Sequence, residues 1–208
     1  MRFVPATVDT RHPLVASRTK RLLDVSGGLV LLVVLALTLP LMALLLKLDS
    51  RGPVFHTQVR VGLDGRPFSI YKLRSMVPCA EEDGLPRWTY CGDPRVTRLG
   101  RLLRASHLDE MPQAINILRG DMSLVGPRPE RPELVGLLTA EFSSFPQRHS
   151  VRPGLTGLAQ VRHCYTTSVA DWHQKLDYDL DYVRRATCLT DVRILLATVV
   201  EVVRFKGM

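Results

Sequence analysis

Cysteine is scarce in this 208-residue sequence, and its placement excludes two classes of small protein. The four cysteines lie far apart, with no C-x-x-C pair and no histidine at zinc-ligand spacing: Cys79, Cys91, Cys164 and Cys188. A disulfide scaffold needs cysteines packed densely into a short chain, and a zinc finger needs closely spaced ligand pairs. We therefore expect ordinary reduced thiols in a chain that faces the cytosol.

Several signatures of common enzyme classes are also missing. The sequence contains no G-x-x-x-x-G-K-[ST], no G-x-G-x-x-G, no H-E-x-x-H and no G-x-S-x-G. These motifs build the phosphate loop of nucleotide hydrolases, the dinucleotide turn, the zinc site of metalloproteases and the serine elbow of hydrolases. The chemistry of this chain has to be sought in other residues.

Acidic residues are outnumbered, with 20 Asp plus Glu against 28 Lys plus Arg and a formal net charge of +8. The hydrophobic fraction of 46% excludes a disordered polyelectrolyte, and the length suits one domain or one domain with an appendage. The positive excess favours partners that carry phosphate: nucleic acid, an anionic lipid surface or a phosphorylated small molecule. Charge alone does not choose among them.

The longest apolar run extends over 18 positions, from Leu29 to Leu46, and only Thr38 and Pro40 interrupt it. At about 1.5 Å per residue, a helix of this length covers most of a bilayer core. Basic residues flank both ends: Arg18, Lys20, Arg21, Lys47 and Arg51. Because positive flanks mark the cytoplasmic side and Pro40 predicts a kink, a bent helix that returns to its own face competes with a plain spanning helix.

The rest of the chain alternates turn signals with short patterned segments. Val54 to Val61 and Pro67 to Met76 predict a hairpin with Asp64-Gly65 in its turn. Helical patterns follow at 97–105, at 108–118 with Ser106 as the candidate cap and Gly120 as the stop, at 169–185 and at 191–205. Loops are expected at 81–87, 126–129 and 152–157. The fold class is therefore α+β, mostly helical with a small β-hairpin.

Asp109 and Glu110 form an adjacent carboxylate pair in the first turn of one of these helices. Taken alone, such a pair complements the helix dipole. A carboxylate can also attack phosphorus, provided that cations screen its repulsion from the phosphate. Arg104 and Arg128, the second held between two prolines, are suitable cations because guanidinium matches phosphate oxygens bidentately.

The order of these segments resembles the bacterial sugar transferases known as monotopic phosphoglycosyl transferases. The resemblance runs from about Ser17 to Phe205 and rests on long motifs. They are Lys20-Arg21-Leu22-Leu23-Asp24, Thr57-Gln58-Val59-Arg60-Val61-Gly62, Lys72-Leu73-Arg74-Ser75-Met76, Leu108-Asp109-Glu110-Met111-Pro112-Gln113, Leu118-Arg119-Gly120-Asp121-Met122-Ser123-Leu124-Val125-Gly126-Pro127-Arg128-Pro129 and Arg152-Pro153-Gly154-Leu155-Thr156-Gly157-Leu158-Ala159-Gln160-Val161.

The resemblance implies transfer of a sugar 1-phosphate from a uridine diphosphosugar to a polyprenyl phosphate such as undecaprenyl phosphate, with release of uridine monophosphate. It implies Mg²⁺ as cofactor, Asp109 as the nucleophile that carries a covalent phosphosugar, and Glu110 as its assistant; both carboxylates are candidate metal ligands. The substrate-binding positions are Lys72, Arg104, Arg128, Thr156 and Gln160. This reaction starts the membrane stage of a surface glycan: an exopolysaccharide, an O-antigen or a glycoprotein glycan.

The resemblance also implies a division of the chain: a cytoplasmic segment at 1–21, a re-entrant membrane helix at 22–50 bent at Pro40, and a catalytic domain at 51–208 with interfacial amphipathic helices. The expected location is the cytoplasmic face of the bacterial inner membrane. A second copy of the chain is a candidate partner, and nucleic acid is not expected. Leu158 and Arg162-His163-Cys164 depart from the family pattern, which leaves the roles of Arg162 to Cys164 open.

Two rival hypotheses use other residues. Asp179-Leu180-Asp181 matches the D-x-D pattern of metal-dependent glycosyltransferases, which release uridine diphosphate, although Asp177 and Asp181 suggest a solvated helix face. A membrane-tethered module for nucleic acid or anionic lipid would use the positive charge and the G-x-x-G loop Gly154-Leu155-Thr156-Gly157. That loop contains no basic residue.

Overall fold

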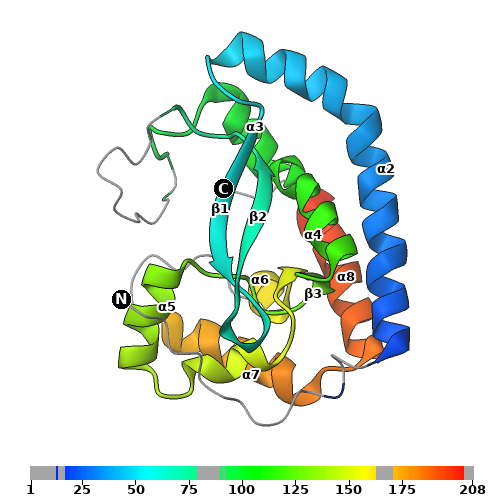
Figure 1. Cartoon of the computed structure of the whole chain (residues 1–208), viewed down its shortest axis with the longest axis vertical. Helices are drawn as coiled ribbons and strands as arrows, with labels where there is room; N and C mark the ends of the chain where they lie inside the picture. Colours follow the sequence, from blue (N-terminus) through cyan, green and yellow to red (C-terminus); the bar gives the residue numbers. More distant parts are fainter. Residues whose placement is uncertain (1–12, 14–16, 79–89, 91, 163–170, 204–208) are drawn as a thin grey trace.

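The computed structural model describes residues 13, 17–78, 90, 92–162 and 171–203 (Figure 1). Of the four cysteines, only Cys188 lies in this part of the chain, and its thiol is free. The predictions for Cys79, Cys91, His163, Cys164 and the polar loop at 81–87 concern residues outside this part. Two predicted helix boundaries also lie outside it: the start at Val169 and the end at Phe205.

The described elements confirm an α+β protein that is mainly helical. In chain order they are α2 (Arg18–Asp49), β1 (Phe55–Val61), the 3₁₀ turn η1 (Leu63–Gly65), β2 (Pro67–Leu73), α3 (Arg98–Ala105), the 3₁₀ helix η2 (Leu108–Gln113), α4 (Ala114–Arg119), β3 (Ser123–Val125), α5 (Pro132–Glu141), the 3₁₀ helix η3 (Phe145–Ser150), β4 (Gly154–Thr156), α6 (Leu158–Arg162), α7 (Trp172–Arg185) and α8 (Cys188–Val203).

Helix α2 contains the long apolar run. Ser17 caps its N-terminus by accepting a hydrogen bond from the backbone N–H of Lys20 at 3.3 Å. The helix continues through Pro40, so the proline does not end it, although Figure 1 shows the axis curving over toward α3. Its outer face is apolar and exposed, and it has the length and composition of a membrane helix, with a mean hydropathy of 3.0 over 18 residues.

Both ends of α2 are tied to the rest of the protein by arginines. Near its N-terminus, Arg21 donates to the carbonyl oxygens of Ile117 and Leu118, at 2.7 Å each, at the end of α4. Beyond β2, Arg74 donates to the carbonyls of Leu46 and Ser50, at 2.8 and 2.7 Å. The Leu46 and Ile117 carbonyls also accept from the backbone N–H groups of Ser50 and Gly120, so the arginines add bonds at two helix ends and fix α2 along the same body.

The β1–β2 hairpin confirms the sequence prediction. Phe55 pairs with Leu73 and Val61 with Pro67 in antiparallel register, and Asp64 takes a left-handed conformation (φ 54°) in the turn. After glycine, Asn and Asp tolerate this region best, which agrees with Asp64 in the turn. The second strand ends at Leu73, earlier than predicted; beyond it, Met76 makes a single antiparallel bridge with Val96.

A second sheet was not predicted. The three-residue strands β3 and β4 pair in parallel, with Ser123 opposite Gly154 and Val125 opposite Thr156, inside segments expected to be a motif and a loop. The backbones approach so closely that a Cβ on Gly126 would lie 2.3 Å from the carbonyl oxygen of Arg152. Only glycine permits this contact.

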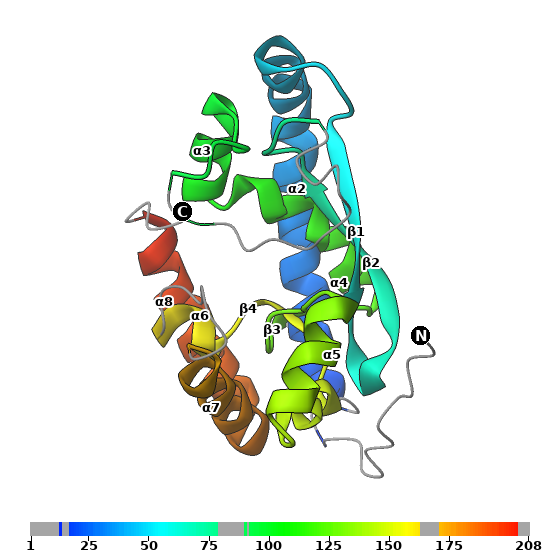
Figure 2. The same cartoon turned by 90° about the vertical axis from the view of Figure 1, so that its left-hand side faces the viewer.

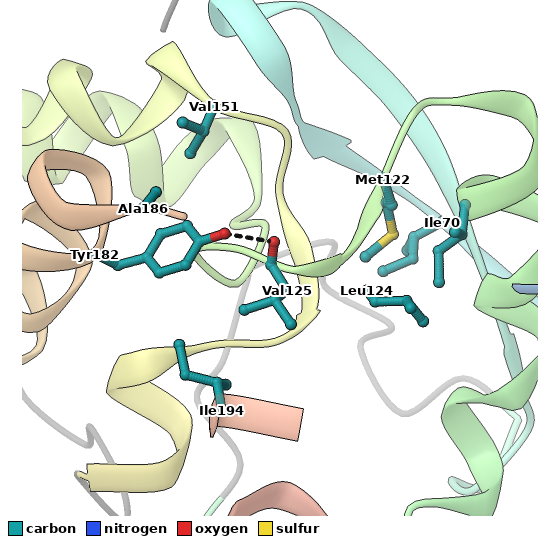
Figure 3. Close-up of a cluster of buried hydrophobic side chains, with 9 residues drawn as sticks. Ile70, Met122, Leu124, Val125, Val151, Tyr182, Ala186 and Ile194 are labelled. Carbon is teal, nitrogen blue, oxygen red and sulfur yellow. Dashed lines mark hydrogen bonds between the residues drawn. The ribbon is translucent and has the colours of Figure 1, made fainter. Parts of the chain in front are cut away.

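The main core surrounds this sheet. Figure 2 shows α6, α7 and α8 on one side and the hairpin on the other, with β3 and β4 between them. In Figure 3, side chains from β2 (Ile70), β3 (Leu124 and Val125), α7 (Tyr182) and α8 (Ile194) converge. The Tyr182 hydroxyl donates to the Val125 carbonyl at 3.0 Å, which gives the buried phenol its partner.

Other predictions need correction. The helix predicted at 108–118 is two elements, η2 and α4, because Pro112 lacks the N–H that a regular α-helix requires. Ser106 is not an N-cap: it ends α3, and its hydroxyl bonds back to the Leu102 carbonyl. Helix α5 was not predicted, and the last helix begins at Cys188, earlier than the predicted start at Asp191.

Candidate active site

A sharp turn between α3 and η2 sets the direction of the carboxylate pair. His107 adopts φ 57°, a left-handed conformation that is uncommon for a residue other than glycine. Helix α3 therefore stops, and the chain turns into η2, whose first turn buries Asp109 and Glu110 at 6% exposure each. Buried carboxylates are rare unless they are paired or functional, so this turn is the structural origin of the site.

Glu110 is held by two cations from two other segments. The ammonium of Lys72, on β2, donates to Oε1 at 2.8 Å. Arg128, which follows β3, donates one Nη to Oε1 and the other to Oε2, the second at 3.1 Å. This bidentate fork is the strongest arrangement that guanidinium and carboxylate adopt. The site thus joins the hairpin, η2 and the segment after β3.

The charges around Glu110 keep it ionised. Burial would raise the pKa of Glu110, but the positive charges of Arg128 and Lys72 outweigh burial and hold the pKa well below its usual range. Burial lowers the pKa of the Lys72 ammonium, and Glu110 offsets part of that effect. Glu110 therefore stays a fixed negative charge that orients two cations.

Asp109 has a different environment, although it is the next residue. Within the described residues, no hydrogen bond or ion pair holds its carboxylate. Burial and the negative charge of Glu110 raise the pKa of Asp109 to about 6, against weaker opposing effects of Lys72, Arg104 and Arg128. At neutral pH the group is a carboxylate with its lone pairs free and three cations nearby, which is the state that a nucleophile needs.

Hydrogen bonds from three directions hold the backbone that carries Arg128. Arg148 donates to the Arg128 carbonyl at 2.8 Å, and Arg60 donates to the Pro129 carbonyl at 3.2 Å. The backbone N–H of Val61 donates to the Glu130 carbonyl at 2.9 Å. Three consecutive carbonyls of this segment therefore have hydrogen-bond partners. These bonds restrict the position and direction of the Arg128 backbone, and hence of its side chain.

The side chain of Glu130 provides further contacts that stabilise this segment. It accepts from Lys175 of α7 at 2.9 Å and lies 3.7 Å from Arg60 of β1. Burial would raise the pKa of Glu130, but the charges of Lys175, Arg60 and Arg148 lower it to about 2. The hairpin and α7 are thus joined across the segment that carries Arg128.

The other predicted site residues have different partners. Arg104 donates through Nε to the Ser75 hydroxyl at 2.8 Å; burial lowers its pKa, and the negative charge of Asp109 partly offsets this. The Thr156 hydroxyl pairs with Thr198 of α8 at 2.7 Å, and the Gln160 amide donates to the Leu155 carbonyl at 3.0 Å. The structure thus groups Lys72, Asp109, Glu110 and Arg128, with Arg104 close enough to affect Asp109, whereas Thr156 and Gln160 bond elsewhere.

The donor set of the carboxylate pair fits a magnesium ion that arrives with its substrate. Glu110 accepts three hydrogen bonds of the roughly four that a carboxylate can accept, and Asp109 accepts none from the described residues. Mg²⁺ sites commonly use one or two carboxylates and complete their shell with substrate phosphates and water. No group of three or more His, Cys, Asp or Glu that could hold a metal by itself occurs in the described residues.

The D-x-D pattern does not form a metal site. Asp179 is 1% exposed and pairs with Arg148, whereas Asp181 pairs with Arg185 at the surface. The two carboxylates therefore do not share a ligand. The solvated face inferred from Asp177 and Asp181 agrees with an exposed Asp177 and a half-buried Asp181, whereas Asp179 between them is buried on the side of α7 that packs against η3. Gly154 to Thr156 form β4 rather than a projecting loop.

Sequence reasoning missed several residues around the site. Three basic residues were not among the predicted site residues: Arg60, Arg148 and Lys175. Each of them bonds either to the backbone next to Arg128 or to the side chain of Glu130. Arg60 stands in one of the recognised motifs, which is a signal for it. Nothing in the spacing of Arg148 and Lys175 indicates their partners, since these lie 20 to 45 residues earlier.

Comparison with known proteins shows the family to which the chain is similar. A family model described as bacterial sugar transferase matches residues 15–205. The chain is 45% identical over 182 residues to a UDP-glucose:undecaprenyl-phosphate glucose-1-phosphate transferase of Caulobacter vibrioides. It is 42% identical over 180 residues to a UDP-N-acetylgalactosamine-undecaprenyl-phosphate N-acetylgalactosaminephosphotransferase of Aeromonas hydrophila, and 42% identical over 195 residues to an exopolysaccharide production protein of Rhizobium leguminosarum bv. phaseoli.

The relatives differ in length. The alignments with the Caulobacter and Aeromonas proteins each cover 86% of this chain, but 68% and 42% of the respective relative. The alignment with the Rhizobium protein covers 90% of this chain and 97% of that relative. The chain therefore spans less than half of one relative and nearly all of another.

Proposed function

Because this chain belongs to the bacterial sugar transferase family, we propose that it transfers a sugar 1-phosphate from a uridine diphosphosugar to undecaprenyl phosphate. The products are undecaprenyl diphosphosugar and uridine monophosphate. The observation that carries the proposal is the contrast within the carboxylate pair: Glu110 is clamped by Lys72 and Arg128, whereas the buried Asp109 is left without a partner among the described residues.

The proposed chemistry has two displacements at one phosphorus. An oxygen of Asp109 attacks the phosphorus attached to the sugar, the bond to the bridging oxygen breaks, and uridine monophosphate leaves. An oxygen of undecaprenyl phosphate then attacks the same phosphorus and releases the Asp109 carboxylate. Each step exchanges one P–O bond for another, so neither needs an oxidant or a reductant.

The surrounding cations lower the barrier by screening charge. A carboxylate and a diphosphate repel each other, and the fixed positive charges of Lys72, Arg104 and Arg128 oppose that repulsion without reorganising. Glu110 holds two of these cations in place. Asp109 and Glu110 would hold Mg²⁺ together with the diphosphate, and the ion would supply further charge neutralisation on the phosphate oxygens.

We also propose that α2 is re-entrant and places the site at the cytoplasmic face of the inner membrane. Arg21 ties one end of the helix to α4, and Arg74 ties the other end to the chain beyond β2. A helix fixed at both ends to one charged body does not leave its two ends on opposite sides of a bilayer. Its exposed apolar face would enter the lipid from one side, and the reaction would start a surface glycan there.

The nucleotide released by the purified, detergent-solubilised chain tests the proposal. The chain is incubated with Mg²⁺, undecaprenyl phosphate and a panel of uridine diphosphosugars; Asp109→Asn is assayed beside it, with the exposed Asp177→Asn as matched control. We expect uridine monophosphate from the native chain and the control and none from Asp109→Asn. Release of uridine diphosphate would indicate glycosyl transfer instead, and normal turnover of Asp109→Asn would remove the nucleophile assignment.

A further inference from the structure

A buried ion pair joins η3 to α7 behind the site. Arg148 donates through Nε and Nη2 to Oδ2 of Asp179, at 3.0 and 2.7 Å. The two residues are 2% and 1% exposed. A buried ion pair is weak support for stability, because removing both charges from water can cost as much as their attraction returns. A role of this pair other than stability should therefore follow from the other contacts of Arg148 and Asp179.

The same guanidinium also contacts the backbone of Arg128. Nη2 of Arg148 donates to the Arg128 carbonyl at 2.8 Å, so one side chain bridges Asp179 and Arg128. Aromatic rings flank the bridge: the guanidinium carbon lies 5.1 Å from the centre of the Phe145 ring and 5.8 Å from that of Trp172. Ion pairing and ring contacts together leave the guanidinium little freedom.

The contacted carbonyl controls the direction of a site residue. Arg128 stands between two prolines, and the residue before a proline is already confined to extended backbone conformations. Within that range, the hydrogen bond from Arg148 selects the orientation of the peptide unit that follows Arg128. The Arg128 side chain leaves from this backbone and reaches both oxygens of Glu110.

We propose that Arg148 and Asp179 are positioning residues for Arg128, so that the first aspartate of the D-x-D pattern serves the reaction without touching substrate or metal. Asp179 orients Arg148, Arg148 fixes the Arg128 carbonyl, and Arg128 places its fork on Glu110 beside Asp109. This inference rests on the proposed function, because it assigns the pair a role in the same phosphosugar transfer.

The test removes both charges together. In the full-length chain, Arg148→Met/Asp179→Leu deletes the pair and leaves neither partner as an unpaired buried charge. Asp181→Asn, the other aspartate of the pattern, breaks an exposed pair with Arg185 and is the matched control. Release of uridine monophosphate gives kcat, and thermal unfolding reports the fold. We expect near-native unfolding of the double variant with kcat lowered about 10- to 100-fold, as for a displaced site group, and no change in the control.

A second comparison, between two backgrounds at position 128, distinguishes a positioning role of the pair from a general loss of structure. In an Arg128→Lys background, the same double substitution should lower kcat by less than about twofold, because a pair that acts through Arg128 has nothing left to position. An equal loss in both backgrounds would overturn the inference, as would native kcat in a folded double variant. If the double variant does not fold, Arg148→Lys keeps the charge but not the rigid fork, and the same two backgrounds apply. Absence of uridine monophosphate from the unsubstituted chain would instead contradict the proposed function.

Discussion

At the scale of single residues, the two neighbouring carboxylates have opposite environments. The residue pattern identified Asp109 and Glu110 as a pair without distinguishing them, and only the family resemblance implied Asp109 as the nucleophile and Glu110 as its assistant. In the structure the distinction comes from Lys72 and Arg128, 38 and 18 residues away, which donate hydrogen bonds to Glu110 but act on Asp109 only through their charge. Tertiary contacts therefore pair one carboxylate with two cations and leave the other without a hydrogen bond among the described residues.

The raised pKa of Asp109 predicts an acid limit for turnover. In the proposed mechanism the ionised form attacks, so kcat/KM for the donor should be constant at neutral pH and fall as the pH decreases through about 6. The rate of uridine monophosphate release between pH 5 and 8, at donor concentrations well below KM, measures this limb. Exposed Asp177→Asn should leave the profile unchanged. An acid limb near 4, the usual range of an aspartate, would contradict the environment described for Asp109.

His149 predicts a second pH effect, on stability rather than on turnover. Burial and the positive charge of Arg148 lower the pKa of His149 to about 3, whereas the unfolded chain has a value near 6.5. Below pH 6.5 the unfolded state therefore binds a proton that the folded state does not bind, and the free energy of unfolding falls as the pH falls. At pH 5 the loss should be about 2 kcal/mol relative to pH 7.

Urea unfolding of the detergent-solubilised chain at pH 7 and pH 5 checks the prediction for His149. His149→Gln should abolish this part of the pH dependence, while the exposed His173→Gln should keep it. The same pH dependence in His149→Gln and in the native chain would show that another group is responsible.

At the scale of elements, the base of α2 is joined to β3 by a buried polar cluster. Oδ1 of Asp24 accepts from the Leu124 N–H and the Ser123 hydroxyl at 2.9 Å each, and from Lys20 at 3.0 Å. Lys20 also pairs with Asp191 of α8 at 2.7 Å. Charged side chains of α2 and α8 therefore form one cluster with polar groups of β3. This strand ends a few residues before Arg128.

This cluster predicts a large effect of a single substitution. Asp24→Ala leaves the Leu124 N–H without its acceptor and removes one of the two carboxylates around Lys20, so we expect the free energy of unfolding to fall by about 3–5 kcal/mol. Asp24→Asn, which keeps an acceptor oxygen, should lose less. Denaturant unfolding measures both, with Asp177→Ala as the exposed control. A loss below about 1 kcal/mol for Asp24→Ala would mean that the cluster does not join these elements.

The elements that were predicted correctly depend on local signals. The hairpin follows from the Asp64-Gly65 turn, and α3 follows from its apolar spacing behind Thr97, which caps it by accepting from the Gly100 N–H. The sheet of β3 and β4 could not be read in this way, because its three-residue strands pair across about thirty residues of chain. The ion pair of Asp179 could not be predicted for the same reason: its partner, Arg148, lies 31 residues earlier.

At the scale of the whole molecule, a charged catalytic body is combined with a long helix, α2, whose outer face is apolar. The outer face of α2 exposes large side chains along its length, including Val33 at 58% and Leu37 at 77%. Such a face is far more apolar than a soluble surface requires, whereas the net charge of +8 is what anionic lipid attracts. The two features predict different responses to salt.

Membrane binding should survive high salt. At 1 M salt the screening length is about 3 Å, which abolishes attraction between an exposed basic surface and lipid but leaves apolar burial intact. We expect the chain to float with phosphatidylglycerol-containing vesicles in both 0.1 and 1 M NaCl. Leu37→Glu, which places a charge on the exposed face, should weaken binding at both concentrations. Release of the native chain by 1 M NaCl would indicate surface adsorption instead of insertion.

The central claim, that Asp109 carries the phosphosugar, is tested most directly by the mass of the protein itself. The chain is incubated with Mg²⁺ and its uridine diphosphosugar in the absence of undecaprenyl phosphate, then analysed by intact and peptide mass spectrometry. The account predicts a gain of one sugar phosphate on the peptide that contains Asp109, its loss when undecaprenyl phosphate is added, and no gain in Asp109→Asn. An adduct on another residue, or turnover by a chain that never gains the mass, would contradict it.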